Sequence, residues 1–290
     1  MIFAIMMLET AVDSMPTTIF VQNAAVTVSL TISTTHISSK GTIVFTFLFL
    51  ICSTGTKVMI TTGLPHSSAT KTEILDVVSG ETCVDLDDYP LYSRGAVGAN
   101  LYGAPVVCGG AYDTYLQKCY KFINGGWQEF ASMKNKRWLA AGVMYKKTFH
   151  VFGGLNINYI GLQTSEIISI DGGVDYGPDL PTGVFGHAIT SVNATVSILT
   201  GGRTNADFFS RLTWYFNHET KTFSSGPSLL DTREGHGSAT VVDKVTYAKI
   251  PIVAGGVANY LALNSTELLI NGQWQSGTVQ CKKETCFDLH

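Results

Sequence analysis

The sequence predicts an all-β fold built as a stacked or circular array of about five repeats, each contributing four short strands. Gly-Gly doublets carry this prediction, because each closes a short apolar run in the last two thirds of the 290-residue chain. The doublets stand at 109–110, 153–154, 201–202 and 255–256, and a degenerate copy ends at Gly63. Successive copies are about 44 to 54 residues apart, a period typical of such arrays.

Residues 93–133 show the order of elements within one repeat most clearly. Small and apolar residues alternate over 93–99, and a continuous apolar run over 105–108 ends in the doublet. Alternation returns over 117–123, and a turn of asparagine and glycines separates this segment from 127–130. Short runs of β-forming residues between such turns predict four antiparallel strands, the second of them buried on both faces.

The other repeats keep this order, with third-strand patterns at 71–77, 165–171, 211–217 and 265–271. Aromatic residues mark two further positions in some copies. Tyr120 and Trp127 stand seven residues apart, and Phe216 and Phe223 have the same spacing. Trp274 holds the later of these positions in the last repeat. The repeats therefore share a strand order and, in part, an aromatic pattern.

A Gly-Gly doublet followed by an aromatic residue and a tryptophan at a fixed offset resembles the kelch repeat. The resemblance covers roughly residues 57 to 277. It implies a β-propeller, in which each repeat forms one four-stranded blade around a central channel. It also implies that the glycines adopt positive φ and that large aromatics fill the space between blades. The expected fold is therefore an all-β propeller of about five four-stranded kelch blades.

This expectation leaves open which strand closes the ring. Five blades are fewer than most kelch propellers have, and the first repeat has no obvious first strand. A strand from the other terminus usually closes such rings, and residues 278–280 or 286–289 are the candidates here. The alternative is that one blade is missing from the sequence.

Residues 1–55 are interpreted as a leader that contains a segment typical of signal peptides. The apolar core of this segment, residues 43–52, follows Lys40 and precedes the small residues 53–55. A membrane-spanning helix needs about 20 apolar residues, so this shorter core favours a cleaved signal peptide over an uncleaved anchor. We therefore expect a secreted protein with no stable membrane span, whose folded domain covers residues 57–290.

Two N-glycosylation sequons agree with secretion. They begin at Asn193, in the predicted turn between a first and a second strand, and at Asn264, in the loop before a third strand. Both positions are expected to be exposed, as glycan attachment requires.

The charge pattern argues against nucleic acid as a partner. The chain has 19 basic and 22 acidic residues and a formal net charge of −3, without a basic run or stripe. No linker rich in proline, glycine or serine divides the repeats. A single repeat domain is therefore expected.

The cysteines suggest one disulfide and no metal site. Cys108 and Cys119 flank the loop between two predicted neighbouring strands, which makes them the first-choice disulfide. The pairing of the other cysteines stays open. Cys281 and Cys286 have no second pair of ligands nearby, so zinc is not expected.

No catalytic constellation stands out, and no cofactor or metal is expected. His187 and His236 occupy the same place before the first strand of their repeats, which favours a structural role. His150 begins a second strand and is expected in the wall of the channel. A structural interpretation also applies to the arginines ahead of first strands, which are Arg94, Arg137 and Arg233.

The segments that follow the doublets are the candidate functional surface. In a propeller these loops gather on one face, where exposed aromatics beside an arginine are typical of a protein-binding surface. The alternative is that these side chains pack on each other and merely cap the face. The candidate binding residues are Tyr112, Tyr115, Tyr159, Arg203, Phe208, Phe209 and Tyr260.

These observations favour an extracellular kelch propeller that binds a protein or glycan partner without catalysis. One alternative is a copper-dependent extracellular oxidase on the same fold, which would use a redox tyrosine near a cysteine, such as Tyr120 beside Cys119. A second alternative is an intracellular kelch adaptor. The leader argues against the adaptor.

Overall fold

The structure is a computed structural model. It describes residues 4–8, 17–21, 29–37, 43–52, 57–62, 70–76, 82–83, 86–206, 209–242 and 246–277. All the regular elements in these ranges are β-strands, so the all-β prediction is confirmed. A search of the same residues finds no helix that is both long and apolar enough to cross a membrane.

Five antiparallel sheets, numbered 1 to 5 in chain order, make up the body of the described fold. Sheet 1 consists of β3 (Ser29–Ile37), β4 (Ile43–Cys52), β5 (Lys57–Thr61), β6 (Thr72–Asp76) and β7 (Thr82–Cys83). Sheet 2 consists of β8 (Val97–Leu101), β9 (Ala104–Cys108), β10 (Lys118–Ile123) and β11 (Gly126–Ser132). Sheet 3 consists of β12 (Ala141–Tyr145), β13 (Thr148–Phe152), β14 (Ser165–Ser169) and β15 (Val174–Tyr176).

The last two large sheets follow the same order of four strands. Sheet 4 consists of β17 (Ala188–Ser191), β18 (Val196–Thr200), β20 (Thr213–Asn217) and β21 (Thr222–Ser225). Sheet 5 consists of β22 (Gly237–Val242), β23 (Lys249–Ala254), β26 (Thr266–Ile270) and β27 (Gln273–Gly277). The short pairs are β1 (Ala4–Leu8) with β2 (Thr17–Val21), β16 (Val184–Phe185) with β19 (Arg203–Thr204), and β24 (Val257–Ala258) with β25 (Leu261–Ala262).

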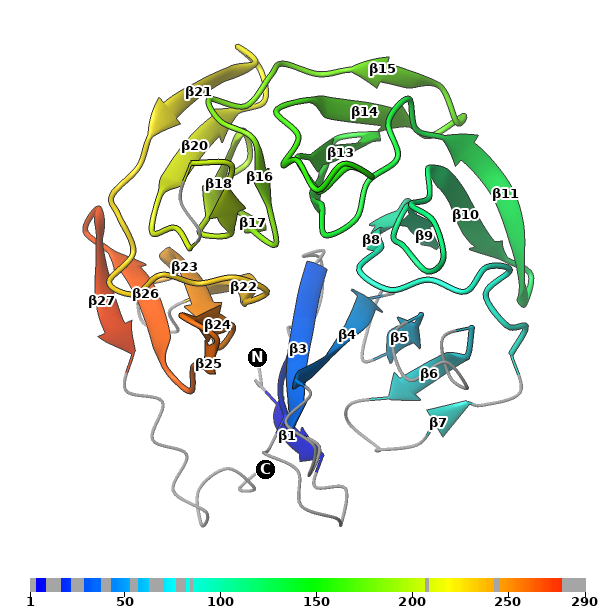
Figure 1. Ribbon diagram of the computed structural model, residues 1–290, viewed down its shortest axis with the longest axis horizontal. Coiled ribbons are helices and arrows are strands. Elements are labelled where there is room, and N and C mark those ends of the chain that lie inside the picture. The colour runs from blue at the N-terminus through cyan, green and yellow to red at the C-terminus, as the bar shows by residue number, and fades with distance from the viewer. Residues whose placement is uncertain are drawn as a thin grey trace.

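The sheets lie side by side around a common centre, with their first strands innermost (Figure 1). Strand β8 lies against β12, β12 against β17, and β17 against β22. Strand β22 in turn lies against β3, and β4 lies against β8. Each sheet therefore has a neighbour on either side through its inner strands.

The doublets join each sheet to the next. In three sheets the second glycine donates its N–H to a carbonyl at the start of the following sheet, in the bonds Gly110–Arg137, Gly154–Val184 and Gly202–Arg233. The first glycine also has no room for a side chain, because a Cβ at Gly109 would lie 2.7 Å from the Arg137 carbonyl oxygen. Its φ of +67° is a second reason for glycine at this place. The sequence pattern therefore reflects the joint between sheets.

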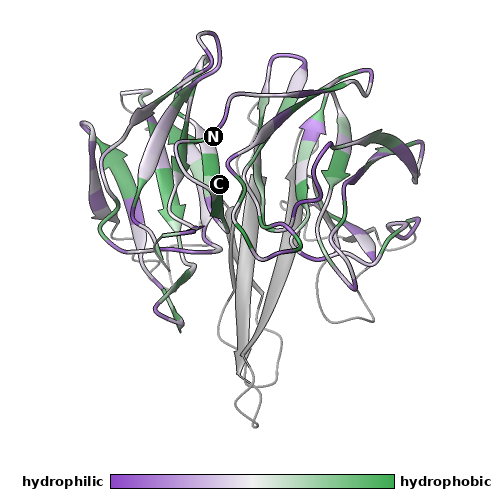
Figure 2. Cartoon of the chain, turned by 45° about the horizontal axis from the view of Figure 1, so that its top comes forward, coloured by the Kyte–Doolittle hydropathy of each residue, from purple (hydrophilic) through white to green (hydrophobic). Residues whose placement is uncertain are grey.

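Apolar side chains fill the spaces between adjacent sheets, as expected. Tyr120 and Trp127 of sheet 2 pack with Met59 of sheet 1, and the Trp127 indole N–H donates to Thr72 Oγ1 at 3.0 Å. Figure 2 shows hydrophobic residues concentrated within the strands and hydrophilic residues in many of the connections. Burial of such large rings stabilises the contact between sheets.

The other aromatics of the repeat have the same role. Phe216 and Phe223 of sheet 4 pack with Phe152 of sheet 3, with the rings of Phe152 and Phe216 5.1 Å apart. Trp274 of sheet 5 is buried in a cluster with Ile198 of sheet 4. The aromatic positions of the repeat are thus scaffold positions.

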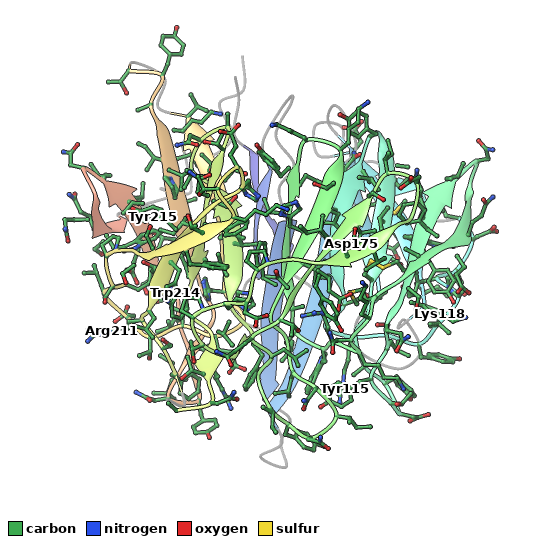
Figure 3. The ribbon with its side chains drawn as sticks, turned by 90° about the horizontal axis from the view of Figure 1, so that it is seen from above. Tyr115, Lys118, Asp175, Arg211, Trp214 and Tyr215 are labelled. Atoms are coloured by element: carbon green, nitrogen blue, oxygen red, sulfur yellow. A yellow bond between two sulfur atoms is a disulfide. The ribbon has the colours of Figure 1, made fainter. Side chains whose placement is uncertain are left out.

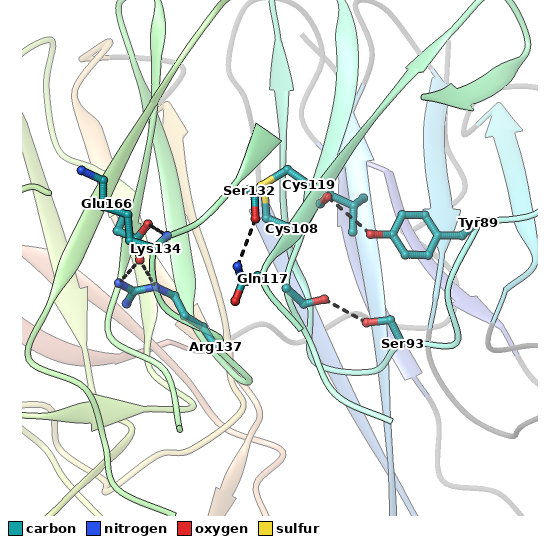
Figure 4. Close-up of a disulfide and its surroundings, with 11 residues drawn as sticks. Tyr89, Ser93, Cys108, Gln117, Cys119, Ser132, Lys134, Arg137 and Glu166 are labelled. Carbon is teal, nitrogen blue, oxygen red and sulfur yellow. Dashed lines mark hydrogen bonds and ion pairs between the residues drawn. A yellow bond between two sulfur atoms is a disulfide. The ribbon is translucent and has the colours of Figure 1, made fainter. Parts of the chain in front are cut away.

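A buried ion pair fixes the start of sheet 3. Arg137 and Glu166 have fully buried side chains, with Arg137 Nη2 2.7 Å from Glu166 Oε1 (Figure 4). Arg137 Nη1 also donates to the carbonyl oxygens of Gly153 at 2.6 Å and Thr164 at 2.8 Å. The arginine therefore ties the first strand to the loop between the second and third strands.

Sheet 5 repeats this arrangement with Arg233 and Glu267, whose Nε and Oε1 atoms are 2.9 Å apart. Arg233 Nη1 donates to the carbonyl oxygens of Gly255 and Ser265, again across the doublet loop. Arg94 does not belong to this set, although the sequence grouped it with Arg137 and Arg233. Its guanidinium lies over the Trp138 ring instead, because Arg94 stands one position later in its repeat.

The predicted disulfide between Cys108 and Cys119 is confirmed. The two residues stand opposite each other in the pairing of β9 with β10, and both are buried (Figure 4). Adjacent antiparallel strands bring such residues close enough for a bridge. The sequence could therefore predict this pair from strand order alone.

Residues 43–52, predicted as the core of a signal peptide, form β4 in this structure. Strand β4 pairs with β5 between Phe49↔Thr61 and Cys52↔Val58, which is the place of a first strand beside a second one. The first repeat thus has a first strand in a segment that the sequence assigned to the leader. Removal of this segment as a signal peptide stays a prediction. The expected closing strands, 278–280 and 286–289, lie outside the described residues.

Candidate functional site

The loops that follow the doublets meet at one end of the sheets. There the residue after each doublet pairs with a residue just before the first strand, in the pairs Arg94–Ala111, Trp138–Leu155, Phe185–Arg203 and Glu234–Val257. We call this end the doublet face. It comprises residues 92–95, 109–117, 137–139, 153–164, 183–186, 201–206, 209–212, 233–235 and 255–265.

One aromatic group on the doublet face spans sheets 2 and 3. The Tyr115 ring lies edge-on to Trp138 at 5.8 Å and to Tyr159 at 6.4 Å, and Arg94 covers the Trp138 ring at 5.2 Å. Tyr115 is buried, whereas Tyr159 is 76% exposed. Burial raises the pKa of the Tyr115 hydroxyl, with Tyr159 adding to the effect and Arg94 opposing it. Tyr159 is thus the exposed tip of a packed group. Figure 3 shows Tyr115 at this end of the molecule.

A second group lies over sheets 4 and 5. Arg203 Nε is 2.7 Å from Glu234 Oε2, and the Arg203 guanidinium lies over the rings of Phe209 at 4.4 Å and Tyr260 at 5.5 Å. The two rings are edge-on to each other at 5.4 Å. Burial raises the pKa of Glu234, and the charge of Arg203 opposes that shift. Tyr260 is 54% exposed and stands at the edge of this group.

The predicted binding residues divide into exposed and packed ones. Tyr159 and Tyr260 are exposed, Tyr115 is buried, and Tyr112 is half-buried with its ring 5.3 Å from Tyr92. Arg203 and Phe209 are half-buried in the second group, and Phe208 lies outside the described residues. The structure brings Tyr115 to Tyr159 and Arg203 to Phe209 and Tyr260. A binding role for these residues stays a prediction.

Sequence reasoning missed several residues of this face. Trp138 joins Arg94 to Tyr115, and Glu234 holds Arg203. Further exposed apolar side chains on the doublet face are Tyr92, Ile157, Ile160 and Leu261. A signal for Trp138 and Glu234 existed, because both hold the position of Arg94 in their own repeats.

The predicted glycosylation sites are both exposed. Asn193 lies in the hairpin between β17 and β18, where its Oδ1 accepts hydrogen bonds from the N–H groups of Thr195 and Val196 at 2.9 Å. Asn264 lies in the loop before β26. Glycan attachment itself stays a prediction.

The repeated histidines are packed in the scaffold. His187 and His236 are both buried, and His236 Nε2 is 2.8 Å from Thr200 Oγ1. Burial lowers the pKa of each to about 3, with Arg137 acting on His187 and Arg233 on His236 in the same direction. Both are therefore neutral at neutral pH, which agrees with a structural role.

His150 was expected in the wall of the channel, and this was wrong. It packs between sheets 3 and 4, where its Nδ1 is 3.3 Å from His218 Nδ1. His218 Nε2 lies 2.8 Å from Ser197 Oγ. This order of serine, histidine and a third polar group resembles a nucleophile with its base. Ser197 is only 1% exposed, however, so its hydroxyl does not face a substrate.

The residues named for the copper alternative are occupied in the scaffold. Cys119 is in the disulfide, and the buried Tyr120 ring lies edge-on to Tyr89 at 5.4 Å. Among the residues that the structure describes, no group of three or more His, Cys, Asp or Glu side chains is placed to hold a metal ion.

Comparison with known proteins adds no family assignment. No protein-family model matches the sequence, and no curated protein matches it significantly.

Proposed function

We propose that the chain is a kelch-type β-propeller of five blades that acts outside the cell as a non-catalytic binding module for a protein or a glycan. The observation that carries the binding role is the pair of exposed tyrosines on the doublet face. Tyr159 and Tyr260 each stand on a packed group that includes an arginine, Arg94 in one case and Arg203 in the other. Such anchored aromatics are typical of binding hot spots, because little conformational entropy is lost when they bind.

The inner strands support a closed ring. Strands β22 and β3 are in contact, β3 pairs with β4, and β4 contacts β8, so the path of contacts returns to the second sheet. In this proposal β4 is the first strand of the first blade. A mature chain that began after residue 55 would lack β3 and β4, and another segment would have to fill their place.

The buried disulfide supports an extracellular location. Disulfides persist in oxidising compartments and are rare in the cytosol. The Cys108–Cys119 bridge therefore favours secretion over the intracellular adaptor. The two exposed sequons point in the same direction.

Secretion predicts a specific set of modifications. We expect protein recovered from the medium of an animal cell culture to carry glycans at Asn193 and Asn264 and the Cys108–Cys119 bridge, because all three are compatible with the fold. Intact mass before and after deglycosylation, with peptide mapping, measures them together. Retention inside the cell with reduced cysteines and no glycan would contradict the proposal. Sequencing of the N terminus in the same sample shows whether residues 43–52 are kept.

The doublet face is expected to hold the binding site. The probes are a printed array of neutral and sulfated glycans and a panel of immobilised extracellular protein domains. For any probe that binds, Tyr159→Ala and Tyr260→Ala should each weaken binding by about 2 kcal/mol or more, roughly 30-fold in Kd. Surface plasmon resonance with the purified variants measures the change.

Tyr102→Ala is the matched control for these variants. Tyr102 is 59% exposed and has a positive φ, as Tyr159 and Tyr260 do, but it stands in the β8–β9 hairpin at the opposite end of sheet 2. Its replacement should leave binding unchanged. Loss of binding in the Tyr102 variant, with Tyr159→Ala and Tyr260→Ala unaffected, would place the site at the hairpin end.

A further inference from the structure

Two buried histidines meet at the joint between sheets 3 and 4. His150 lies on β13 and His218 directly follows β20, and each side chain is 5% exposed. Their Nδ1 atoms are 3.3 Å apart, so the two rings share one hydrogen bond across the joint. The pair lies near the β12–β13 and β20–β21 hairpins, away from the doublet face. It is separate from the proposed binding site.

The surrounding groups fix which nitrogen carries each proton. The Thr148 hydroxyl donates its proton to the Tyr145 carbonyl oxygen at 2.7 Å, so at 2.9 Å it accepts from His150 Nε2–H. A neutral His150 then has a lone pair at Nδ1, and His218 Nδ1–H donates to it. His218 Nε2 consequently accepts from the Ser197 hydroxyl at 2.8 Å. In this series of hydrogen bonds, every donor has an acceptor when both rings are neutral.

The pair is enclosed mainly by rings. Tyr145 stacks on His218 with ring centroids 4.4 Å apart, and Phe216 lies edge-on to His218 at 4.8 Å. The aromatic contacts leave an added positive charge with little solvation.

The charged groups at the hairpins do not offset the desolvation cost of protonating either histidine. Lys146 of the β12–β13 hairpin and Glu219 of the β20–β21 hairpin form an ion pair at 3.7 Å, and the Tyr145 hydroxyl donates to Glu219 at 3.5 Å. The Glu219 carboxylate is thus already paired with Lys146. The positive charge of Lys221 also opposes protonation of His150.

Proton uptake changes this series of hydrogen bonds in two steps. A proton on His218 Nε2 requires the Ser197 hydroxyl to turn, after which His218 donates from both nitrogens. A proton on His150 Nδ1 places two N–H groups against each other across the 3.3 Å contact, and the shared hydrogen bond is lost. The joint is therefore complete with both rings neutral and broken with both rings charged.

We propose that the His150–His218 pair is an acid-sensitive joint between sheets 3 and 4, closed by the shared hydrogen bond and opened when the pair takes up protons. The proposal needs no ligand and stands independently of the binding role. It assigns a regulatory function to residues that the repeat pattern does not explain.

The direction of the pH dependence follows from the two pKa values. Burial lowers the pKa of His150 to about 3, with His218 and Lys221 adding to the shift, and burial lowers the pKa of His218 to about 4. The ordinary pKa of histidine is 6.5, so between about pH 3 and pH 6.5 the open or unfolded state binds more protons than the closed state. The stability that the neutral pair contributes to the joint is full above pH 6.5 and is lost as the pH falls toward 4 for His218 and toward 3 for His150. At about pH 5 each histidine raises the opening equilibrium constant about 30-fold.

Amide hydrogen exchange on the full chain tests the joint. The reporter is the His218 N–H, which donates to the Thr195 carbonyl at 2.8 Å beside the pair, and the reference is the Met133 N–H at the end of sheet 2, which donates to the Gln117 carbonyl at 2.9 Å. After correction for intrinsic exchange rates, we expect the His218 amide to lose at least about tenfold protection between about pH 7.5 and about pH 5, with the Met133 amide much less affected. An unchanged His218 amide, or equal loss at both amides, would overturn the proposal.

The variant His218→Gln removes one of the two titrating rings, because its amide can accept from Ser197 and donate to His150 without titrating. It should lose clearly less protection on acidification than the native protein, because only His150 still titrates. The matched control His236→Gln removes an equally buried histidine outside the pair and should retain the acid response. An acid response in His218→Gln as large as that of the native protein, or a response that disappears in His236→Gln, would refute the assignment.

A direct titration of the native protein covers the case in which His218→Gln does not fold. Imidazole NMR signals should show that His150 and His218 remain neutral to below about pH 5 and that the first proton changes the signals of both rings. Independent titration of either ring near its ordinary pKa would overturn the proposal.

Discussion

Replacing Arg137 with methionine is expected to lower the free energy of unfolding by about 3–5 kcal/mol. The change leaves the Glu166 carboxylate buried without its cation, and it removes the donor to the carbonyl oxygens of Gly153 and Thr164. Breaking a buried pair from one side is costly, because the remaining charge keeps its desolvation penalty. Chemical denaturation followed by tryptophan fluorescence measures the effect.

Two further variants separate the charge from the packing. The double variant Arg137→Met, Glu166→Met should recover part of the loss, because no unpaired charge remains, although the N–H groups of Lys134 and Asn135 lose their acceptor. Lys118→Met is the exposed control: its ion pair with Glu129 is half-exposed, so little change is expected. A loss in Lys118→Met as large as that in Arg137→Met would show that the burial argument is wrong.

The second large effect is expected at a doublet. In Gly201→Ala the new Cβ would lie 2.5 Å from the Arg233 carbonyl oxygen, at a φ of +59°. That oxygen cannot retreat easily, because it also accepts the hydrogen bond from the Gly202 N–H at 2.6 Å. We expect the free energy of unfolding to fall by about 3 kcal/mol or more, the sum of backbone strain and a strained joint between sheets 4 and 5.

Two other glycines serve as controls for the same measurement by thermal and chemical denaturation. Gly125 has a φ of +86° in a hairpin with open space around its missing Cβ, so Gly125→Ala should cost only about 1–2 kcal/mol from the backbone. Gly255 holds the same doublet position as Gly201, yet the nearest described atom to its Cβ is 3.7 Å away. Gly255→Ala should therefore resemble Gly125→Ala. Equal losses at Gly201 and Gly125 would mean that the joint contributes nothing.

Much of the scaffold could be predicted because its determinants are local. The Cys108–Cys119 bridge follows from two adjacent strands, and the aromatic positions such as Trp127 and Phe216 follow from the repeat. The candidate surface was predicted less well. Tyr115 and Tyr159 have the same aromatic character in the sequence, and only their packing shows that one is buried and the other exposed.

Strand β4 of sheet 1 shows a different limit. Residues 43–52 are apolar throughout, and such a run suits a signal peptide and a buried strand equally well. Pattern alone cannot choose between these, because a strand with both faces buried has no alternation. The pairing with β5 gives the segment its place in the structure.

The sequence by itself determined the all-β class, the order of strands within each repeat, the glycines at the joints and the disulfide. These depend on neighbouring residues, on φ and on contacts within one hairpin or sheet. Only the tertiary structure decided that His150 meets His218, 68 positions away, that Arg137 pairs with Glu166, and which side chains reach the doublet face. Those contacts depend on how separate strands and sheets pack against each other. No local pattern in the sequence encodes the relative placement of strands that are far apart in the chain.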